Sequence, residues 1–483
     1  MTPLSVIITI AAYFVILFTV SYIAGRKADN AGFFVGNRKS SWYVVAFAMV
    51  GSAISGVTYV SVPGMVAASS FGYLQMVLGF IAGQLIIAYL LVPLFYKMNL
   101  VSIYEYLENR FGMSSYRTGA WFFFISKMLG AAVRLFLVCL TLQLLVFEPF
   151  GLPFLLNVAI TVALVWLYTF QGGVKSLIWT YSLKTFCLVV SVVLCIWYIA
   201  SDLNLSFTGM VSTIADSDMS RIFFFDDVNS KQYFFKQFLA GAFTMIAMTG
   251  LDQDMMQRNL SCKNFKDSQK NMITSVISQF FVILLFLMLG VLLYIFAANQ
   301  QIAVEKSDEL FPLIATGNYF PAIVGILFII GLISSAYSAA GSALTALTTS
   351  FTVDILGTKG KSEEVVKMRK KVHIGMAVVM GITIFVFNLL NNTSVIDAVY
   401  ILASYTYGPI LGLFAFGIFM KQQVRDKYIP LVAIASPVLC FILQKNSEAW
   451  FGGYQFSYEL LIFNALFTFI GLCLLIKKDK KNN

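Results

Sequence analysis

The sequence predicts an all-helical integral membrane protein with about thirteen transmembrane helices, and two observations carry this prediction. The 483 residues are 59% hydrophobic and only 12% charged, whereas about a quarter of the residues of a soluble domain are charged. A transmembrane helix needs roughly 20 predominantly apolar residues, and such segments recur from Pro3 to Ile476. The polar stretches between them are short. The composition therefore excludes an ordinary soluble enzyme and leaves no room for a separate soluble domain.

The individual spans follow from the apolar runs. The first run has no basic region before it and no small-residue cleavage site after it, so we expect a retained helix and not a signal peptide. The thirteen predicted spans are residues 3–25, 42–68, 72–96, 118–147, 152–170, 176–201, 233–257, 272–298, 320–353, 373–391, 396–420, 429–445 and 458–476.

Charge predicts the orientation of these spans. Most of the 33 Lys and Arg residues fall in alternate loops, including the run 359–371 and the tail 477–481, whereas the opposite loops are rich in Asp and Glu. By the positive-inside rule the basic face is cytoplasmic. We expect a multi-pass protein of the plasma or inner membrane with its N-terminus outside and its C-terminus inside. The net charge of +10 then reflects orientation, and no nucleic-acid partner or obligate protein partner is expected.

Two predicted spans are interrupted by helix-breaking and hydroxyl residues. Residues 48–70 read AMVGSAISGVTYVSVPGMVAASS, and five spans later residues 238–254 read FLAGAFTMIAMTGLDQD. Irregular backbone at membrane depth is tolerated only where it is buried in protein or lines a wet cavity. Two interrupted helices in corresponding positions of successive five-helix blocks indicate an inverted repeat with a binding site near the midplane. The alternative is that the small residues serve close helix packing.

The ninth span is rich in hydroxyl groups. Ser335, Ser338 and Ser342 are spaced at three and four residues, so they share one helix face. Hydroxyl and carbonyl oxygens can replace the hydration shell of a monovalent cation. Hydrogen bonding between helices explains the same spacing equally well.

The sequence resembles the sodium/solute symporter family over nearly its whole length. The most specific segment is YTFQGGVKSLIWT (residues 168–180), which is similar to the family's Tyr-Thr, Gly-Gly and Trp-Thr signature. Six further segments match in the same order along the chain, namely FFVGNR (33–38), SVPG (61–64), IYEYLENRF (103–111), QDMMQR (253–258), VDIL (353–356) and SYTYGPILGLF (404–414).

The resemblance implies a transporter that works by alternating access, with a core of ten helices in two inverted five-helix repeats. One extra helix precedes the core and two follow it. We therefore divide the chain into an N-terminal helix and loop (1–40), a first repeat (41–205), a second repeat (206–428) and two C-terminal helices with a basic tail (429–483).

The resemblance also implies one site for the sodium ion. Its ligands on this chain are the carbonyl groups of Gly51, Ile54 and Ser335 and the hydroxyl of Ser338. The family's next hydroxyl falls on Ala339, so a side-chain ligand is missing unless water or Ser342 substitutes.

A second family ion site is altered. Members often have an acidic residue directly after the Trp-Thr pair, where this chain has Tyr181, and the neighbouring position on the ninth span is Gly341. We therefore predict at most one coupled sodium, with Ser342 near the altered site. Lys184 lies one helical turn from Tyr181, and we hypothesise that it stands in electrostatically for a cation there.

Three basic residues fall inside predicted spans, where a charge costs roughly 2.5–3.5 kcal/mol on insertion scales. Besides Lys184 these are Lys127 and Arg134, two turns apart on one face of the fourth span. Some relatives that carry carboxylates use an arginine on this helix, but the corresponding position here is closer to Gly130. Arg134 is therefore a candidate carboxylate clamp that is offset by one turn, and snorkelling or a structural network is the alternative.

The remaining substrate candidates by family position are Ser55, Thr58, Tyr73 and Tyr400. Sugar-carrying relatives tend to have glutamine where this chain has Tyr400, which favours a small acid or similar polar metabolite. The leading hypothesis is sodium-driven import of a small polar organic solute, with a carboxylate as one candidate. The alternatives are a transporter of the same fold without sodium coupling, and a membrane solute sensor. No cluster of catalytic groups suggests an enzyme.

Overall fold

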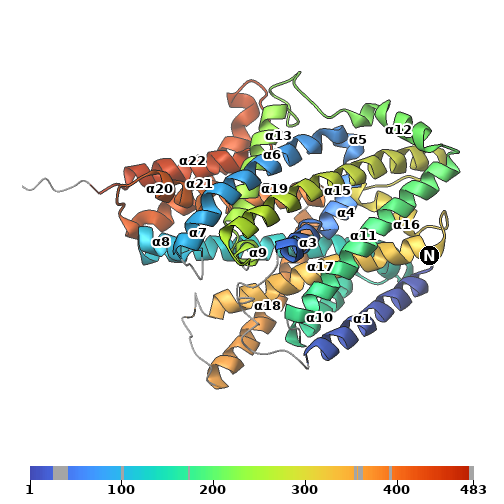
Figure 1. The fold of residues 1–483 in the computed structure, drawn as a ribbon, viewed down its shortest axis with the longest axis horizontal. Coiled ribbons are helices and arrows are strands. Elements are labelled where there is room, and N and C mark those ends of the chain that lie inside the picture. The colour runs from blue at the N-terminus through green and yellow to red at the C-terminus, as the bar shows by residue number, and fades with distance from the viewer. Residues whose placement is uncertain are drawn as a thin grey trace, which may run out of the picture.

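The computed structural model describes residues 1–25, 42–98, 103–171, 174–260, 262–352, 356, 363–390 and 394–477. The described chain is mainly helical, and an isolated β-bridge joins Val424 and Ile476. Long helices run side by side through the molecule (Figure 1). The α-helices are α1 (Pro3–Gly25), α3 (Trp42–Ala53), α4 (Gly56–Gly64), α5 (Val66–Ser69), α6 (Tyr73–Ile86), α7 (Val92–Met98), α8 (Glu105–Arg110), α9 (Met113–Leu142), α10 (Phe154–Gln171), α11 (Val174–Asp202), α12 (Phe207–Ala215), α13 (Phe234–Met245), α14 (Gln253–Asn259), α15 (Phe265–Asn299), α16 (Leu310–Thr316), α17 (Ala322–Ser350), α18 (Glu363–Leu390), α19 (Val395–Thr406), α20 (Gly408–Phe419), α21 (Ile429–Trp450) and α22 (Leu460–Leu474).

Seven helical segments of the described chain are long and apolar enough to cross a membrane, and an eighth is added if the bent pair α19 and α20 counts as one span. Shorter apolar helices occur at 3–16, 154–167 and 460–474. Each of the thirteen predicted segments overlaps one or more of these helices, and the number of crossings stays a prediction. The structure thus confirms an all-helical chain with several apolar spans.

The two interrupted segments are broken helices. The first breaks between α3 and α4 at Ser55, whose backbone is extended (φ −85°, ψ 166°). The Ser55 hydroxyl accepts a hydrogen bond from the amide of Thr58 at 3.3 Å, so the residue ends one helix and caps the next. The small and hydroxyl residues of this segment therefore form a local helix terminus inside the bundle.

The second break separates α13 from α14. A π-helical turn (Ile246–Gly250) follows α13, and Asp252 begins α14 as its N-cap. The Asp252 carboxylate accepts a hydrogen bond from the amide of Met255 at 3.0 Å. The free amide groups at the start of α14 need an acceptor, and this need holds the Asp252 carboxylate in place within the predicted seventh span.

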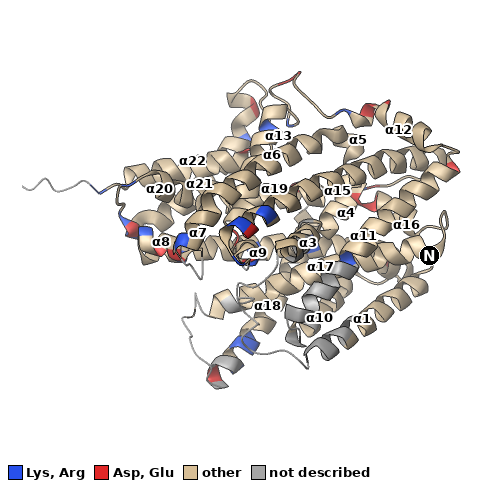
Figure 2. Cartoon of the chain, in the orientation of Figure 1, with Lys and Arg blue, Asp and Glu red and all other residues tan. Residues whose placement is uncertain are grey.

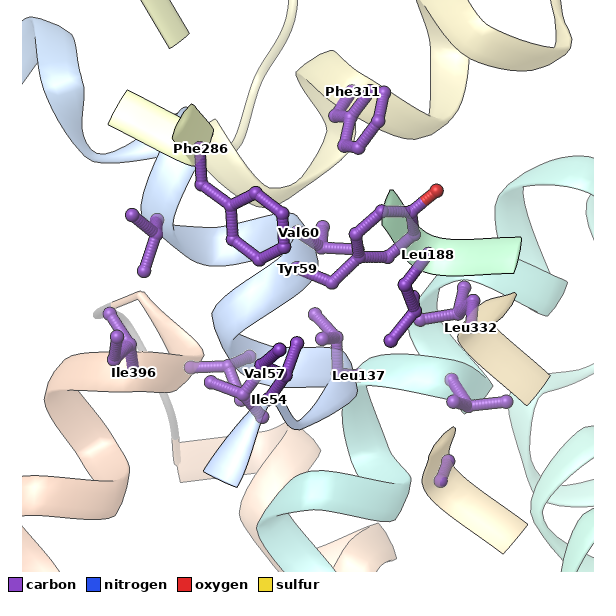
Figure 3. Close-up of a cluster of buried hydrophobic side chains, with 14 of the residues drawn as sticks. Ile54, Val57, Tyr59, Val60, Leu137, Leu188, Phe286, Phe311, Leu332 and Ile396 are labelled. Atoms are coloured by element: carbon purple, nitrogen blue, oxygen red, sulfur yellow. The ribbon is translucent and has the colours of Figure 1, made fainter. Parts of the chain in front are cut away.

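The first break is surrounded by buried apolar side chains from several helices. Figure 3 shows Ile54, Val57 and Tyr59 packed among Leu137 and Leu188, which come from α9 and α11 respectively. Phe286 of α15, Leu332 of α17 and Ile396 of α19 complete this cluster on the other sides. Because the break is enclosed by protein, its freed polar groups must be satisfied inside the bundle.

Glycines allow α6 and α13 to approach closely. A Cβ atom added at Gly79 would lie 2.1 Å from the carbonyl oxygen of Phe238, and one at Gly241 would lie 2.0 Å from that of Met76. Both distances are shorter than any real contact, so only glycine fits. This pair of helices therefore uses the small-residue packing common in membrane proteins.

Many of the charged residues lie near the ends of helices and in the segments that connect them (Figure 2). The chain begins at the end where α12 and α16 lie (Figure 1), since Met1 contacts the carbonyl of Thr316. The last helix ends at the opposite side beside Gln423, close to the carbonyls that bind Arg110 of α8. The described termini therefore lie at opposite ends of the bundle.

Candidate functional site

A cavity of about 170 Å³ lies between the two broken helices. Its wall includes side chains of α3, α4, α6, α9, α11, α13–α15, α17 and α19. All six residues predicted to bind the solute line it, together with two residues of the altered ion site and one predicted sodium ligand: Ser55, Thr58, Tyr73, Lys127, Arg134, Tyr400, Lys184, Ser342 and Ser338. The structure thus brings these residues to one place, and their roles stay predictions.

The charge of this cavity is strongly biased. Among the described residues four basic side chains line it, those of Lys127, Arg134, Lys184 and Arg258, against one acidic side chain, that of Asp254. The four cations have different surroundings, which decide what each can do.

Lys127 is neutralised by carboxylates from α14 and its cap. Its ammonium lies 3.2 Å from Asp252 and 3.2 Å from Asp254, and the Lys127 and Asp252 side chains are 9% and 4% exposed. Arg258 also pairs with Asp254, at 2.9 Å. Because two cations share two carboxylates, this network as a whole is neutral.

Asp252 connects the network to a third broken region. The hydroxyl of Tyr407 donates to its carboxylate at 2.9 Å, and Tyr407 lies where α19 meets α20 at a 47° bend. Asp252 therefore holds the start of α14, the middle of α9 and this bend together.

Arg134 differs from Lys127 and Arg258. It lines the cavity, and within the described part of the chain its guanidinium has no hydrogen bond or ion pair. A Cβ atom added at Gly130 would lie 3.5 Å from an Arg134 Nη atom, so the guanidinium lies over the position one turn earlier. Helical side chains point towards the N-terminus of their helix, which brings the charge of Arg134 to the position that the resemblance indicated for an arginine.

Two tyrosines meet at another side of the cavity. The hydroxyl groups of Tyr73 and Tyr400 are 2.6 Å apart and hydrogen-bonded. The ring of Tyr458 packs beside that of Tyr400, and the Tyr458 hydroxyl bonds to Asp397. This pair joins α6 to α19 across the cavity.

The predicted sodium ligands lie beside the first helix break. A Cβ atom added at Gly56 would lie 3.8 Å from the Cβ of Ser335, so the break faces α17 at this residue. The Ser335 hydroxyl is buried and has no hydrogen-bond partner among the described residues. The Ser338 hydroxyl donates to the Ser335 carbonyl at 3.0 Å, and Ile54 is fully buried next to the break. Buried oxygens with spare acceptor capacity fit a monovalent cation.

Lys184 occupies one of these ligands. Its ammonium donates to the Gly51 carbonyl oxygen at 2.6 Å, and the residue is only 2% exposed. The lysine was expected to face Tyr181, whose side chain lies outside the described residues. Gly341 is buried in α17, and Ser342 lies 3.5 Å from an Nη atom of Arg258.

Sequence reasoning missed the carboxylates of this site. Asp252 and Asp254 fall within the predicted seventh span, where acidic residues need a partner as much as Lys127 does. The presence of opposite charges in two predicted spans was the signal in the sequence that could have predicted this ion pair. Other lining residues carried no such signal in the sequence, among them Gln84, Thr244, Met245, Met248 and Gln279.

The fold and the cavity between broken helices define a multi-pass membrane transporter. The chain belongs to the sodium:solute symporter family, because the sequence model of that family matches residues 33–426.

Relatives cover most of the chain. The human sodium/iodide cotransporter is 24% identical over 83% of this chain and 63% of its own length. The sodium/sialic acid symporter NanT of Aliivibrio fischeri is 25% identical over 86% of this chain and 83% of its own. Human sodium-coupled monocarboxylate transporter 2 is 23% identical over 81% of this chain and 64% of its own. These relatives are transporters and not enzymes.

A solved structure shows the same fold. A substrate-bound, outward-open Na⁺-coupled sialic acid symporter superimposes with a TM-score of 0.78 at 20% identity, covering 97% of each chain. Sodium, the expected ion, is named in the description of this family and in the names of these relatives.

Proposed function

We propose that this protein imports a small organic carboxylate by sodium symport through alternating access. The observation that carries the proposal is the guanidinium of Arg134, which faces the cavity without a carboxylate partner among the described residues. Arg134 is half-buried, and a charge inside a membrane-spanning helix is costly unless it is paired or faces a water-filled cavity. An anionic solute supplies the missing partner, and guanidinium binds carboxylate in a bidentate geometry.

The relatives support the same class of solute. Iodide, sialic acid and monocarboxylates, which appear in the names of the related transporters, are all anions at neutral pH. A volume of about 170 Å³ equals on the order of half a dozen water molecules at the ~30 Å³ that each occupies in the liquid. A short-chain monocarboxylate therefore fits the cavity as it stands.

Solute contacts follow from the lining residues. Arg134 binds the carboxylate, while Ser55 and Thr58 offer hydroxyl groups from the first break. Tyr73 and Tyr400 close the cavity over the solute, and their hydroxyl–hydroxyl bond opens when the solute enters or leaves. Lys127 lines the cavity with its charge already neutralised, so it positions the wall and does not provide the primary clamp.

One sodium ion binds beside the solute, with the carbonyls of Gly51, Ile54 and Ser335 and the hydroxyl of Ser338 as ligands. The unpartnered Ser335 hydroxyl is a further candidate ligand. Tyr181 and Gly341 stand at the altered second ion site, so we propose no second coupled sodium.

The finer architecture belongs to the same proposal. Thirteen crossings place the N-terminus outside and the C-terminus in the cytoplasm of a plasma or inner membrane, which the termini at opposite ends of the bundle support. Residues 41–205 and 206–428 form the two inverted repeats, and the first predicted span of each is a broken helix. Residues 1–40 precede them and residues 429–483 follow.

The test is uptake into proteoliposomes holding the purified full chain. Labelled monocarboxylates, sialic acid, iodide and a neutral sugar are offered under an inward sodium gradient and under an equal choline gradient. We expect accumulation of a monocarboxylate with sodium only. The variant Arg134→Gln should lower uptake by at least about tenfold, the value of one charge-assisted hydrogen bond.

Arg117→Gln is the matched control, because Arg117 is an exposed arginine on the same helix, outside the cavity. Equal uptake in choline would refute the coupling and favour a sodium-independent transporter of this fold. Uptake of the neutral sugar alone, or an Arg134→Gln variant as active as the control, would refute the anion clamp.

A further inference from the structure

Lys184 makes a contact that the proposed function does not use. The carbonyl of Gly51 lies in the last turn of α3, and carbonyls of a last helical turn have no partner within their own helix. The break at Ser55 turns the chain away, so the partner must come from elsewhere. It comes from α11, where the Lys184 ammonium donates to this oxygen at 2.6 Å.

We propose that the Lys184 ammonium is a tethered competitor of the coupled sodium ion, which holds the Gly51 carbonyl until sodium displaces it and so sets the sodium affinity of the transporter. This inference rests on the proposed function, because it concerns the sodium site of that proposal. It adds a residue that regulates ion binding and is not itself a sodium ligand.

The chemistry of the two cations makes them exclusive. A lysine ammonium is a compact unit charge that seeks oxygen atoms, as sodium does. Two like charges that share one carbonyl in a poorly hydrated interior repel strongly. Sodium therefore reaches its full set of ligands only when Lys184 has moved away from Gly51.

The surroundings of Lys184 keep it near the break. The residue is 2% exposed and lines the cavity, where Arg134 adds to the positive charge. Two turns further along α11, the hydroxyl of Ser191 bonds to that of Tyr59 on α4. The same helix therefore contacts both halves of the broken helix, one through a charge and one through a neutral pair.

A purely structural role of Lys184 makes a different prediction. If the lysine only braces the end of α3, removing it lowers stability and leaves the sodium affinity of the folded protein unchanged or weaker. If it competes with sodium, removing it strengthens sodium binding.

The test measures binding of ²²Na⁺ to the purified full chain without any solute. We expect Lys184→Met and Lys184→Gln to bind sodium at least about tenfold more tightly than the unaltered protein, the factor that one charge-assisted hydrogen bond represents. Thermal unfolding in sodium chloride against choline chloride should show a larger sodium-dependent rise of the melting temperature for both variants. If the methionine variant does not fold, the glutamine variant, which keeps a donor for Gly51, carries the test.

Lys236→Gln is the matched control. Lys236 is also buried, at 5% exposure, and its ammonium also donates to carbonyl oxygens, those of Asn229 and Gln455 at 3.1 Å each. It lies on α13 away from the cavity, so its replacement should leave the sodium affinity unaltered.

Three outcomes would overturn the inference: unchanged sodium affinity in the folded Lys184 variants, weaker affinity, or an absence of sodium binding by all proteins. Failure of the proposed function has another signature. A chain that binds sodium more tightly after the Lys184 substitution but accumulates no organic anion retains the tethered competitor and loses the carboxylate proposal.

Discussion

Replacing Lys127 with methionine removes one cation from the buried network and tests whether that network holds the core together. The perturbation leaves Asp254 paired with Arg258 and removes the ammonium that pairs with Asp252. Removing one partner of a buried ion pair costs about 3–5 kcal/mol because a charge stays uncompensated. Asp252 keeps its hydrogen bonds from Tyr407 at 2.9 Å and from the Met255 amide at 3.0 Å, so we expect the lower end, about 3 kcal/mol.

The control is an ion pair of the same chemistry at the surface. Arg221 and Asp226 form a salt bridge with side chains 50% and 70% exposed, and solvent screening limits such a pair to about 0–1 kcal/mol. The free energy of unfolding is measured for Lys127→Met and Arg221→Gln by equilibrium denaturation in mixed micelles. Equal losses in the two variants would refute the buried-network reasoning.

The double variant sharpens this test. Lys127→Met combined with Asp252→Asn removes the two opposite charges together, so it should lose less stability than the two single variants summed. Strict additivity would mean that the ammonium and the carboxylate are energetically independent despite their 3.2 Å separation.

Two further predictions concern α17 and the α6–α13 contact. Ser338→Ala should weaken sodium binding about tenfold through loss of a hydroxyl ligand. Ser334→Ala, on the same helix but outside the residues that line the cavity, should not weaken it. Binding of ²²Na⁺ measures both, and equal affinities would remove Ser338 from the site. Gly241→Ala places a Cβ 2.0 Å from the backbone oxygen of Met76 and should lower the free energy of unfolding by about 1–3 kcal/mol through overpacking. Gly375→Ala, with open space around its Cβ, should leave the free energy of unfolding unchanged or raise it. Unfolding in mixed micelles measures both, and a Gly241→Ala variant of unchanged stability would contradict the close approach of the helices.

The helices and their breaks were predictable because they follow from local properties. Apolar runs of sufficient length specify spans, and Ser55 with its neighbours has the composition of a helix terminus. The placement of Lys127, Arg134 and Tyr400 around one cavity followed from the order of the spans and the resemblance to the family. Such features depend on residues close in the chain or on a known topology.

Contacts between distant helices were not predictable in the same way. Lys127 and Asp252 are 125 positions apart, and their pairing depends on how α9 packs beside α14. Lys184 was predicted to lie beside Tyr181 on its own helix, because a sequence reveals only those neighbours that follow from helical spacing. Its bond to Gly51 requires the packing of α11 on α3, which no local pattern encodes.

The four cations of the cavity differ in their hydrogen-bond and ion-pair partners, and these partners determine which ligand each cation can bind. Lys127 and Arg258 are held by carboxylates, so an incoming anion gains little from them. Lys184 is held by a neutral carbonyl, which a cation can take over. Arg134 has neither kind of partner among the described residues, so an anion gains most there. In the proposed function a solute anion and a sodium ion therefore bind different residues of one cavity. We expect binding of each to favour the other, because the anion compensates positive charge that otherwise repels sodium.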